Sequence, residues 1–378
     1  MTSMRQPYLS KTRRVVLKLG SAVLTAPDGL NRPLIERLVA ESGSLRGGER
    51  EFIIVSSGAI AAGCRKLGLS SPPSGIPQQQ AVAAAGQSAL MQVYEEAFAQ
   101  IGLKVAQILL THDDLESRQR FLNARNTLLT LLQWRVVPII NENDTVATDE
   151  LKFGDNDNLA ALICNLVGAD LLILLTDTDG LFDRDPRQHP DAKLVHLVES
   201  FDAELEKAAS SRAGALGRGG MGSKLQAAKK AAAAGLPSII ANGLTPGILT
   251  KIFAGEEVGT LFLPQAQKLK SRQYWLAYNV NPKGAILVDQ GAWEALVKRH
   301  KSLLPAGIVA VFGGFGKGAA VQLMDPEGYP FAIGLSNYSA RDIARIQGRQ
   351  TKDIEQFLGQ KGYDEVIHRD NLVIFPEI

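Results

Sequence analysis

Residues 217–224, with the sequence Gly-Arg-Gly-Gly-Met-Gly-Ser-Lys, place glycines, a serine and a lysine directly before an alanine-rich stretch typical of a helix. A P-loop requires Gly-Lys followed by Ser or Thr, which is absent here. A dinucleotide fold requires an acid about 20 residues later, yet no Asp or Glu occurs between Gly222 and Glu256. Exposed N–H groups, a helix N-terminus and a first-turn lysine together favour a polyphosphate. A surface loop with a solvated lysine is the alternative.

A second cation, Lys18, lies inside the apolar run 14–20 and precedes Gly20-Ser21, where the backbone can approach a ligand closely. A lysine in a strand is most often a solvated edge residue, so Lys18 alone carries little weight. Two lysines that lie beside glycine turns at the ends of different strands favour a common anionic ligand.

Acidic and amide residues form two clusters, "NENDTVATDE" at 141–150 and "GDNDNLAALICNLVG" at 154–168. Residues 155–158 could act only as helix N-caps, because Asp and Asn are preferred there. Four such residues in a row exceed what one cap needs, and their amides suit the α-carboxylate and α-amine of an amino acid. Neither this run nor "DTDGLFDRDP" at 177–186 has the spacing of a calcium-binding EF-hand.

The available side chains favour phosphoryl transfer over hydrolysis. Ser56 and Ser57 lack the Gly-x-Ser-x-Gly setting of a nucleophilic serine, and none of the five histidines stands out as a base. A carboxylate acceptor is already ionised, so the protein has only to align donor and acceptor and to neutralise the charge on the transferred group. We expect Mg²⁺ to be held mainly by the nucleotide phosphates, without dedicated protein ligands.

These residues follow short apolar runs that alternate with helical patterns. The runs predict six strands, at 14–20, 51–58, 104–111, 136–144, 170–180 and 237–243. Near-continuous apolar strands separated by helices indicate an α/β fold, with a mostly parallel sheet covered on both faces. Ligands of such sheets bind outside the carboxyl ends of the strands, and every predicted strand ends in polar residues or glycine.

The pattern changes after residue 262. Residues 263–275 are polar and contain a proline, which predicts a linker. Glycine-rich, strand-like pieces follow, and they predict a separate, mainly-β domain over 276–370. A short helix is expected within 339–348, with Ser339 as its N-cap.

Composition sets further limits. With 378 residues, 45% of them hydrophobic, the chain is long enough for two domains, and its net charge of +2 gives no general reason to invoke nucleic acid or an anionic membrane. Cys64 and Cys164 lie in apolar helical patterns, which fits reduced core thiols. We expect residues 1–12 to form a loose tail, with no signal peptide and no membrane span, and therefore a cytoplasmic protein.

The motifs resemble those of the glutamate 5-kinase family. The resemblance rests on "VVLKLGSAVL", "SSGAIAAG", "AAAGQSALM", "RQRFLNARNTL", "VVPIINENDTVAT", "GDNDNLAALI", "LLTDTDGLFDRDP" and "GRGGMGSKLQAA", in this order. It implies a three-layer α/β/α amino-acid-kinase fold over 13–262, and a PUA domain of the kind appended to bacterial members over 276–370. It also implies ATP-dependent phosphorylation of the L-glutamate γ-carboxylate, the first step of proline biosynthesis.

The resemblance also implies roles for individual residues. Lys18 and Lys224 would contact the transferring phosphoryl group, and Asp157 would hold both lysines by charge pairing. Glutamate would be bound by Ser57, Asp144 and Asn156. ATP would be bound by Lys18, Thr176, Asp177, Arg218, Gly219, Gly220, Met221, Gly222, Ser223 and Lys224.

Some positions depart from the family pattern. Ser21-Ala22 stands where Thr-Ser is common, Ser56 replaces a threonine, and Gly222 stands where Ser or Thr is usual. Any phosphate contacts at residues 22 and 222 would therefore come from backbone N–H groups.

Two other readings stay open. Kinases that act on aspartate, N-acetylglutamate, carbamate or a nucleoside monophosphate share the fold, although the Asn-Asp and Gly-Asp-Asn-Asp-Asn loops favour free glutamate. The PUA-like domain could instead bind RNA, but residues 265–378 carry only 14 Lys and Arg against 11 Asp and Glu, a weak electrostatic signal. The resemblance further implies feedback inhibition by proline near the glutamate site, and a homo-oligomer, either a dimer or a tetramer.

Overall fold

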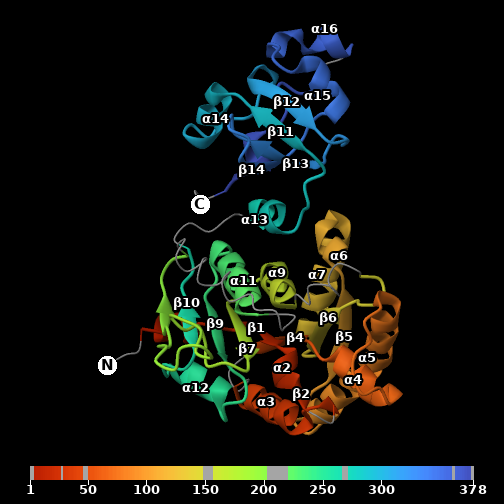
Figure 1. Cartoon of the computed structure of the whole chain (residues 1–378), viewed down its shortest axis with the longest axis vertical. Coiled ribbons are helices and arrows are strands. Elements are labelled where there is room, and N and C mark those ends of the chain that lie inside the picture. Colours follow the sequence, from red (N-terminus) through yellow and green to blue (C-terminus); the bar gives the residue numbers. More distant parts are fainter. Residues whose placement is uncertain are drawn as a thin grey trace. The chain divides into compact units, whose positions relative to one another are not determined.

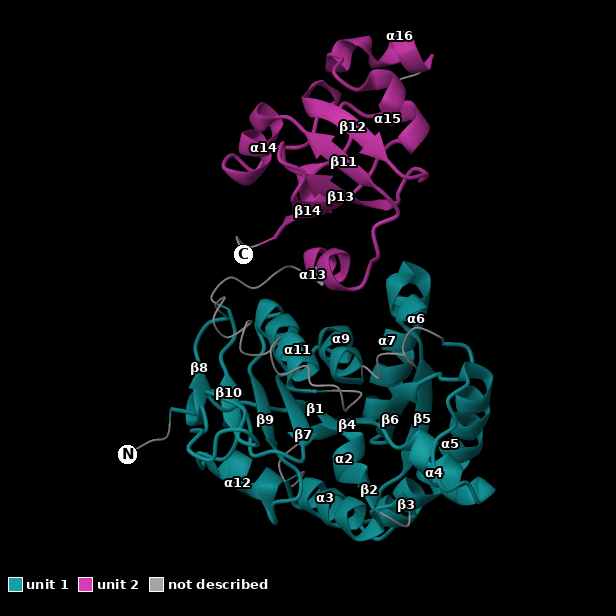
Figure 2. Ribbon diagram, in the orientation of Figure 1, with its two compact units in different colours: residues 1–268 teal, residues 269–378 magenta. Residues whose placement is uncertain are grey.

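The computed structural model describes residues 4–26, 29–45, 50–147, 156–201, 220–265, 271–359 and 362–375 (Figure 1). The chain forms two compact units, residues 1–268 and 269–378 (Figure 2). The division falls inside the predicted linker. Residues 271–275, which were expected to belong to that linker, instead begin helix α13 (Ser271–Tyr278) of the second unit.

The first unit is built on an eight-stranded sheet in the order β5-β6-β4-β1-β7-β9-β10-β8. All six predicted strands are present, as β1 (Arg14–Leu19), β4 (Glu51–Ser56), β5 (Val105–Leu110), β6 (Val137–Glu142), β7 (Leu171–Thr176) and β9 (Ser238–Asn242). These six are parallel, which confirms the mostly parallel sheet. The sequence analysis missed β8 (Leu197–Val198) and β10 (Thr260–Phe262); β10 runs antiparallel to β9. A separate two-stranded hairpin joins β2 (Thr25–Ala26) and β3 (Gly29–Leu30).

Helices cover both faces of this sheet (Figure 2). One face packs on α3 (Arg32–Leu45), α5 (Ile76–Ala99) and α12 (Ile248–Ala254), and the other on α7 (Arg118–Gln133), α9 (Asn156–Val167) and α11 (Met221–Ala233). Val15, Leu17 and Leu19 of β1 belong to the core on the α3 and α5 side. Because successive side chains of a strand point to opposite faces, Lys18 lies on the face that α9 and α11 cover.

The strand order fixes where a ligand can bind. Strands β4, β5 and β6 lie on one side of β1, while β7, β9 and β10 lie on the other. The chain therefore reverses its direction of winding at β1. A crevice outside the carboxyl ends of the strands is expected at such a point.

The N-terminal segment is not a loose tail, so that expectation was wrong for residues 5–12. Residues Gln6–Leu9 form helix α1, and Leu9 is buried in the core of the first unit. The buried guanidinium of Arg5 donates hydrogen bonds to the backbone carbonyls of His196, Glu256, Val258 and Gly259. These four carbonyls lie far along the chain, and no local sequence pattern could reveal them.

The described part of the first unit also contains the shorter helices α2 (Ser21–Leu24), α4 (Ala59–Leu67) and α6 (His112–Glu116). Helices α4 and α5 pack very closely, because a Cβ at Gly63 would overlap the carbonyl of Val82, and one at Gly86 would overlap the carbonyl of Ala59. Cys64 and Cys164 are both free and buried, as predicted.

The second unit contains a five-stranded mixed sheet in the order β12-β11-β13-β14-β15. Its remaining elements are β11 (Ala285–Val288), α14 (Gln290–Val297), β12 (Ile308–Phe312), β13 (Ala320–Met324), β14 (Pro330–Leu335), α15 (Ala340–Ile346), α16 (Ile354–Leu358) and β15 (Leu372–Ile374), with one-turn 3₁₀ helices at Pro305–Gly307, Thr351–Asp353 and Arg369–Asn371. The predicted N-cap is confirmed, since Ser339 Oγ accepts a hydrogen bond from Asp342 N at 3.2 Å. Within the described part of the chain, no helix combines the length and apolar character of a membrane span.

The contact between α4 and α5 yields a stability prediction. Gly86→Ala should lower stability by about 2 kcal/mol, because the added methyl group must push the two helices apart. Calorimetry should show the loss as a lower thermal midpoint. Ala84→Ser, at an exposed position of the same helix, is the control and should stay within about 0.5 kcal/mol of the parent. A Gly86→Ala protein that is as stable as the parent, or more stable, would contradict the close packing.

Candidate active site

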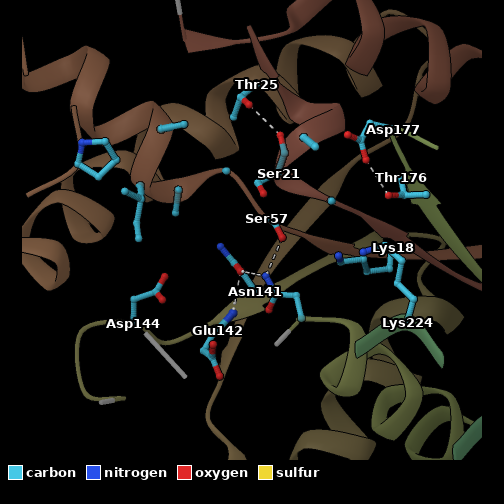
Figure 3. Close-up of a pocket in the computed structure, with 18 residues that line it drawn as sticks. Lys18, Ser21, Thr25, Ser57, Asn141, Glu142, Asp144, Thr176, Asp177 and Lys224 are labelled. Atoms are coloured by element: carbon cyan, nitrogen blue, oxygen red, sulfur yellow. Dashed lines mark hydrogen bonds between the residues drawn. The ribbon is translucent and has the colours of Figure 1, made fainter. Parts of the chain in front are cut away.

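A cavity of about 360 Å³ opens at the carboxyl ends of β6, β4, β1 and β7, where the reversal at β1 predicts a ligand. Its size is typical of a small-molecule site. In Figure 3, Lys18, Lys224, Thr176 and Asp177 lie toward one end, and Asp144 and Glu142 toward the other. The cavity therefore has a cationic end and an acidic and amide end.

Three charged side chains converge at the cationic end. Lys18 Nζ lies 2.6 Å from Asp157 Oδ1, and Lys224 Nζ lies 3.3 Å from Asp157 Oδ2. All three are buried: Lys18 and Lys224 are each 4% exposed, and Asp157 is 1% exposed. They come from three separate elements, β1, α11 and α9. The structure thus brings together the two lysines predicted to contact the phosphoryl group and the aspartate predicted to hold them.

The balance of charge in this cluster favours an anion. Burial by itself raises the pKa of Asp157, but Lys18, Lys224 and a hydrogen bond from Ser223 outweigh it and hold that pKa below its ordinary value. Burial lowers the pKa of Lys224, and Asp157 opposes this effect. Asp177, which also lines the cavity, raises the pKa of Lys224 as Asp157 does. The two ammonium groups make this end of the cavity favourable for a phosphate group.

The first turn of α11 carries Lys224 and supports Asp157. Ser223 Oγ lies 2.7 Å from Asp157 Oδ2, to which it donates, and 2.8 Å from the carbonyl of Gly220, the N-cap residue. A lysine at a helix N-terminus is opposed by the helix dipole, whereas an anion there is favoured. This placement of Lys224 therefore costs stability by itself, and both the ion pair with Asp157 and a negatively charged ligand would offset that cost.

Glycine keeps the approach to the lysines open. A Cβ at Gly20 would lie 3.3 Å from the carbonyl oxygen of Leu175 and 3.5 Å from Lys18 Nζ. A larger residue would therefore press on the carbonyl of Leu175 and fill the space beside the Lys18 ammonium group. The glycine that follows β1 leaves room beside that group for a ligand atom.

Asn156 organises the other end of the cavity. Its Nδ2 lies 3.1 Å from each of three acceptors: the carbonyl of Ser56, Ser57 Oγ and Asn141 Oδ1. These acceptors fix the orientation of the amide, because an inverted amide would place oxygen against oxygen. Asn156 Oδ1 is buried and has no hydrogen-bond partner among the residues that the structure describes. It is therefore an acceptor available to an N–H group of a ligand.

Carboxylates also line this end. Asp144 and Glu142 both line the cavity, and Figure 3 shows Asp144 on the same side as Asn141 and Ser57. Acceptor oxygens and negative charge suit an ammonium group. Gly58, Ala59 and Ile60 line the same region and begin α4, whose N-terminus favours a carboxylate. The set fits the head group of an α-amino acid.

The predicted ATP-binding residues are only partly gathered. Lys18, Lys224, Thr176 and Asp177 line the cavity, and Thr176 Oγ1 donates to Asp177 Oδ1 at 3.1 Å. Gly220 caps α11, and Met221, Gly222 and Ser223 form its first turn, but none of the four lines the cavity. Arg218 and Gly219 lie outside the described residues.

Several lining residues escaped the sequence analysis as site residues. Asn141 and Glu142 stand in the same Asn-Glu-Asn-Asp run as Asp144 and end β6, so that motif was the available signal. Thr25 and Pro72 also line the cavity, and no pattern pointed to either. Among the described residues, no three His, Cys, Asp or Glu side chains lie close enough together to hold a metal ion.

Comparison with known proteins adds to this geometry. Residues 13–242 match the model of the amino acid kinase family, and residues 284–358 match that of the PUA domain. The chain is 54% identical over 372 residues to the glutamate 5-kinase of Geobacter metallireducens, covering 98% of this chain and 100% of that protein. It is 53% identical to the glutamate 5-kinase of Geobacter sulfurreducens, with the same coverage. A solved structure of carbamate kinase from Giardia lamblia bound to AMP-PNP is also similar, at 17% identity and a TM-score of 0.49, over 68% of this chain and all of that one.

The buried cluster predicts a pH-dependent stability. Asp157→Asn should cost about 3 kcal/mol at pH 7, because it leaves two ammonium groups without their carboxylate. The pKa of Asp157 is lower in the folded protein than in the unfolded chain. The carboxylate therefore makes its full contribution to the free energy of unfolding above its unfolded pKa of about 3.9. That contribution is lost as pH falls through the folded pKa. The gap in thermal midpoint between parent and variant should therefore narrow below about pH 4.

The control is Asp191→Asn, which removes an exposed carboxylate 3.4 Å from Arg184. It should cost less than about 1 kcal/mol at any pH. Equal stability of the parent and Asp157→Asn at pH 7, or a gap that widens in acid, would refute the assigned role of Asp157 in the cluster.

Proposed function

The chain belongs to the glutamate 5-kinase family, and we propose that its cavity aligns ATP and L-glutamate for phosphoryl transfer. The reaction yields L-glutamyl 5-phosphate and ADP and is the first step of proline biosynthesis. The observation that carries the proposal is the buried pair Lys18 and Lys224, held by one carboxylate beside an amide-lined acceptor site.

The acceptor binds at the amide and acidic end. Asn156 Oδ1 and the Asp144 carboxylate accept hydrogen bonds from the α-ammonium group of glutamate. The Ser57 hydroxyl and the N-terminus of α4 bind its α-carboxylate. The γ-carboxylate then extends toward the lysines, since both ends belong to one cavity.

The nucleotide binds at the cationic end. Thr176, Asp177 and residues 218–224 hold ATP, with N–H groups of the α11 first turn on its phosphates. Lys18 and Lys224 place their ammonium groups on the transferring phosphoryl group, where charge spreads over three oxygens. Asp157 touches neither substrate and keeps both lysines in place.

No general base is needed for this reaction. The acceptor carboxylate is ionised at neutral pH, and no histidine is among the residues found to line the cavity. The nucleotide phosphates would supply most of the ligands of Mg²⁺, and the ion would neutralise part of their charge. The chain's own contribution is alignment and fixed positive charge.

Family membership extends the proposal to regulation and assembly. Proline carries the same α-carboxylate and an ammonium group, so it would compete for the Asn156 and Ser57 region as a feedback inhibitor. A homo-oligomer and a cytoplasmic location are proposed on the same ground. The alternatives, another carboxylate kinase or an RNA-binding protein, are not favoured, because full-length relatives are named glutamate 5-kinases.

The reaction can be tested with hydroxylamine, which captures acyl phosphates as hydroxamates. The purified full-length chain should form hydroxamate with ATP, Mg²⁺ and L-glutamate. Aspartate, N-acetylglutamate and carbamate should give signals close to background. Hydroxamate that depends on another acid, or none with glutamate, would reject the assigned acceptor.

The role of the second lysine can be tested separately. Lys224→Ala should lower kcat by about 10²–10³, because it removes one preorganised charge from the transition state. Lys229→Ala, on the same helix but outside the cavity lining, is the matched control. A variant with normal kcat and only a raised KM for ATP would show that Lys224 binds ground-state nucleotide alone.

A further inference from the structure

The Ser56-Ser57 turn has a buried support that the proposed mechanism does not use. Tyr94 on α5 is completely buried, and its hydroxyl lies 2.8 Å from Ser56 Oγ. Ser56 is likewise completely buried. Tyr94 is not among the residues found to line the cavity, so its hydroxyl reaches the site only through Ser56.

The direction of these hydrogen bonds can be assigned. Ser56 Oγ donates to the carbonyl of Ser57 at 2.9 Å. A hydroxyl has only one hydrogen to donate, so Tyr94 must be the donor to Ser56 Oγ. Burial raises the pKa of Tyr94 well above its ordinary value, which keeps the phenol protonated. The result is a relay from the Tyr94 hydroxyl to the Ser56 hydroxyl to the Ser57 carbonyl.

The relay orients the turn that binds the acceptor. The N–H of Ser57 donates to the carbonyl of Leu19 at 3.1 Å, and Asn156 Nδ2 holds the carbonyl of Ser56. The relay holds the carbonyl of Ser57, which accepts from Ser56 Oγ. In a trans peptide the C=O and N–H point in opposite directions, so the N–H of Gly58 is aimed away from Tyr94. Gly58 lines the cavity with a positive φ of 99°.

Ser56 makes this support necessary. The methyl group of a threonine at this position would restrict the side-chain rotamer. A serine lacks that restraint, and its hydroxyl could turn away from the Ser57 carbonyl. The Tyr94 hydroxyl supplies the restraint by a hydrogen bond.

We infer that Tyr94 is a positioning residue for the acceptor substrate: through Ser56 it orients the Ser57–Gly58 peptide that receives the α-carboxylate. The inference rests on the proposed function. The relay does not include Lys18, Lys224 or Asp157. Loss of the tyrosine hydroxyl therefore weakens glutamate binding and leaves the phosphoryl-transfer groups in place.

The test is steady-state kinetics of the full-length chain with both substrates varied. Tyr94→Phe should raise KM for glutamate about five-fold, the effect of one hydrogen bond. Its kcat and its KM for ATP should stay within two-fold of the parent. Ser42→Ala removes another buried hydroxyl, one that donates to the carbonyl of Val39 on α3 at 2.7 Å, and should leave all three constants unchanged.

A double-mutant cycle separates the relay from simple packing. Ser56→Ala should raise KM for glutamate at least as much as Tyr94→Phe, and the double variant should match Ser56→Ala. Ser56→Thr placed on Tyr94→Phe should lower KM for glutamate again, because the methyl group restores the restraint. Unchanged KM in Tyr94→Phe, equal losses in kcat and in both KM values, or multiplying effects in the double variant would each overturn the inference. Absence of glutamate-dependent turnover in the parent chain would instead refute the proposed function.

Discussion

The carboxylate of Asp157 between two buried ammonium groups is the constraint on which the rest of this site depends. Lys18 and Lys224 lie far apart in the sequence of the first unit. Their ammonium groups both lie beside Asp157, where they would repel each other without it. Asp157 lies between them and pairs with both. We propose that the phosphoryl group of the nucleotide completes this cluster by bringing negative charge to the two ammonium groups.

The second half of the site follows a different principle. At the acceptor end, the Asn156 Nδ2 group contacts the ends of strands β4 and β6, while its Oδ1 has no partner in the described part of the chain. In the proposed mechanism, this end binds the amino-acid head group through directed hydrogen bonds, whereas the lysine end neutralises charge on the phosphoryl group. The reversal of winding at β1 places the two ends side by side, because β1 carries Lys18 and lies next to β4. In the proposed reaction the acceptor needs no general base, because its carboxylate is already ionised at neutral pH.

Much of this could be predicted from local sequence, for identifiable reasons. Lys18 lies in a predicted strand just before a glycine, and Lys224 follows a glycine-rich loop at the start of a predicted helix. Both lysines were predicted to share one anionic ligand, because parallel strands bring their carboxyl ends to the same edge of the sheet. What failed depends on contacts far along the chain. The sequence of residues 5–12 predicted a tail. In the structure, Arg5 donates hydrogen bonds to the backbone carbonyls of His196, Glu256 and Gly259, which anchor the segment. In the sequence, Tyr94 fits the apolar periodicity of a helix that packs on the core. Its hydrogen-bond partner, Ser56, lies 38 residues away, so no local pattern indicated a polar role for the tyrosine. Helix α13 was not predicted, because it begins in a polar stretch whose composition is typical of a linker.

The most direct measurement is a crystal structure of the full chain with MgADP, L-glutamate and a planar aluminium fluoride mimic of the phosphoryl group. The present account predicts both ammonium groups within hydrogen-bonding distance of the fluorides, with Asp157 still paired to both lysines. A complex in which either lysine points away from the mimic, or in which Asp157 leaves the lysines to bind the metal, would contradict it.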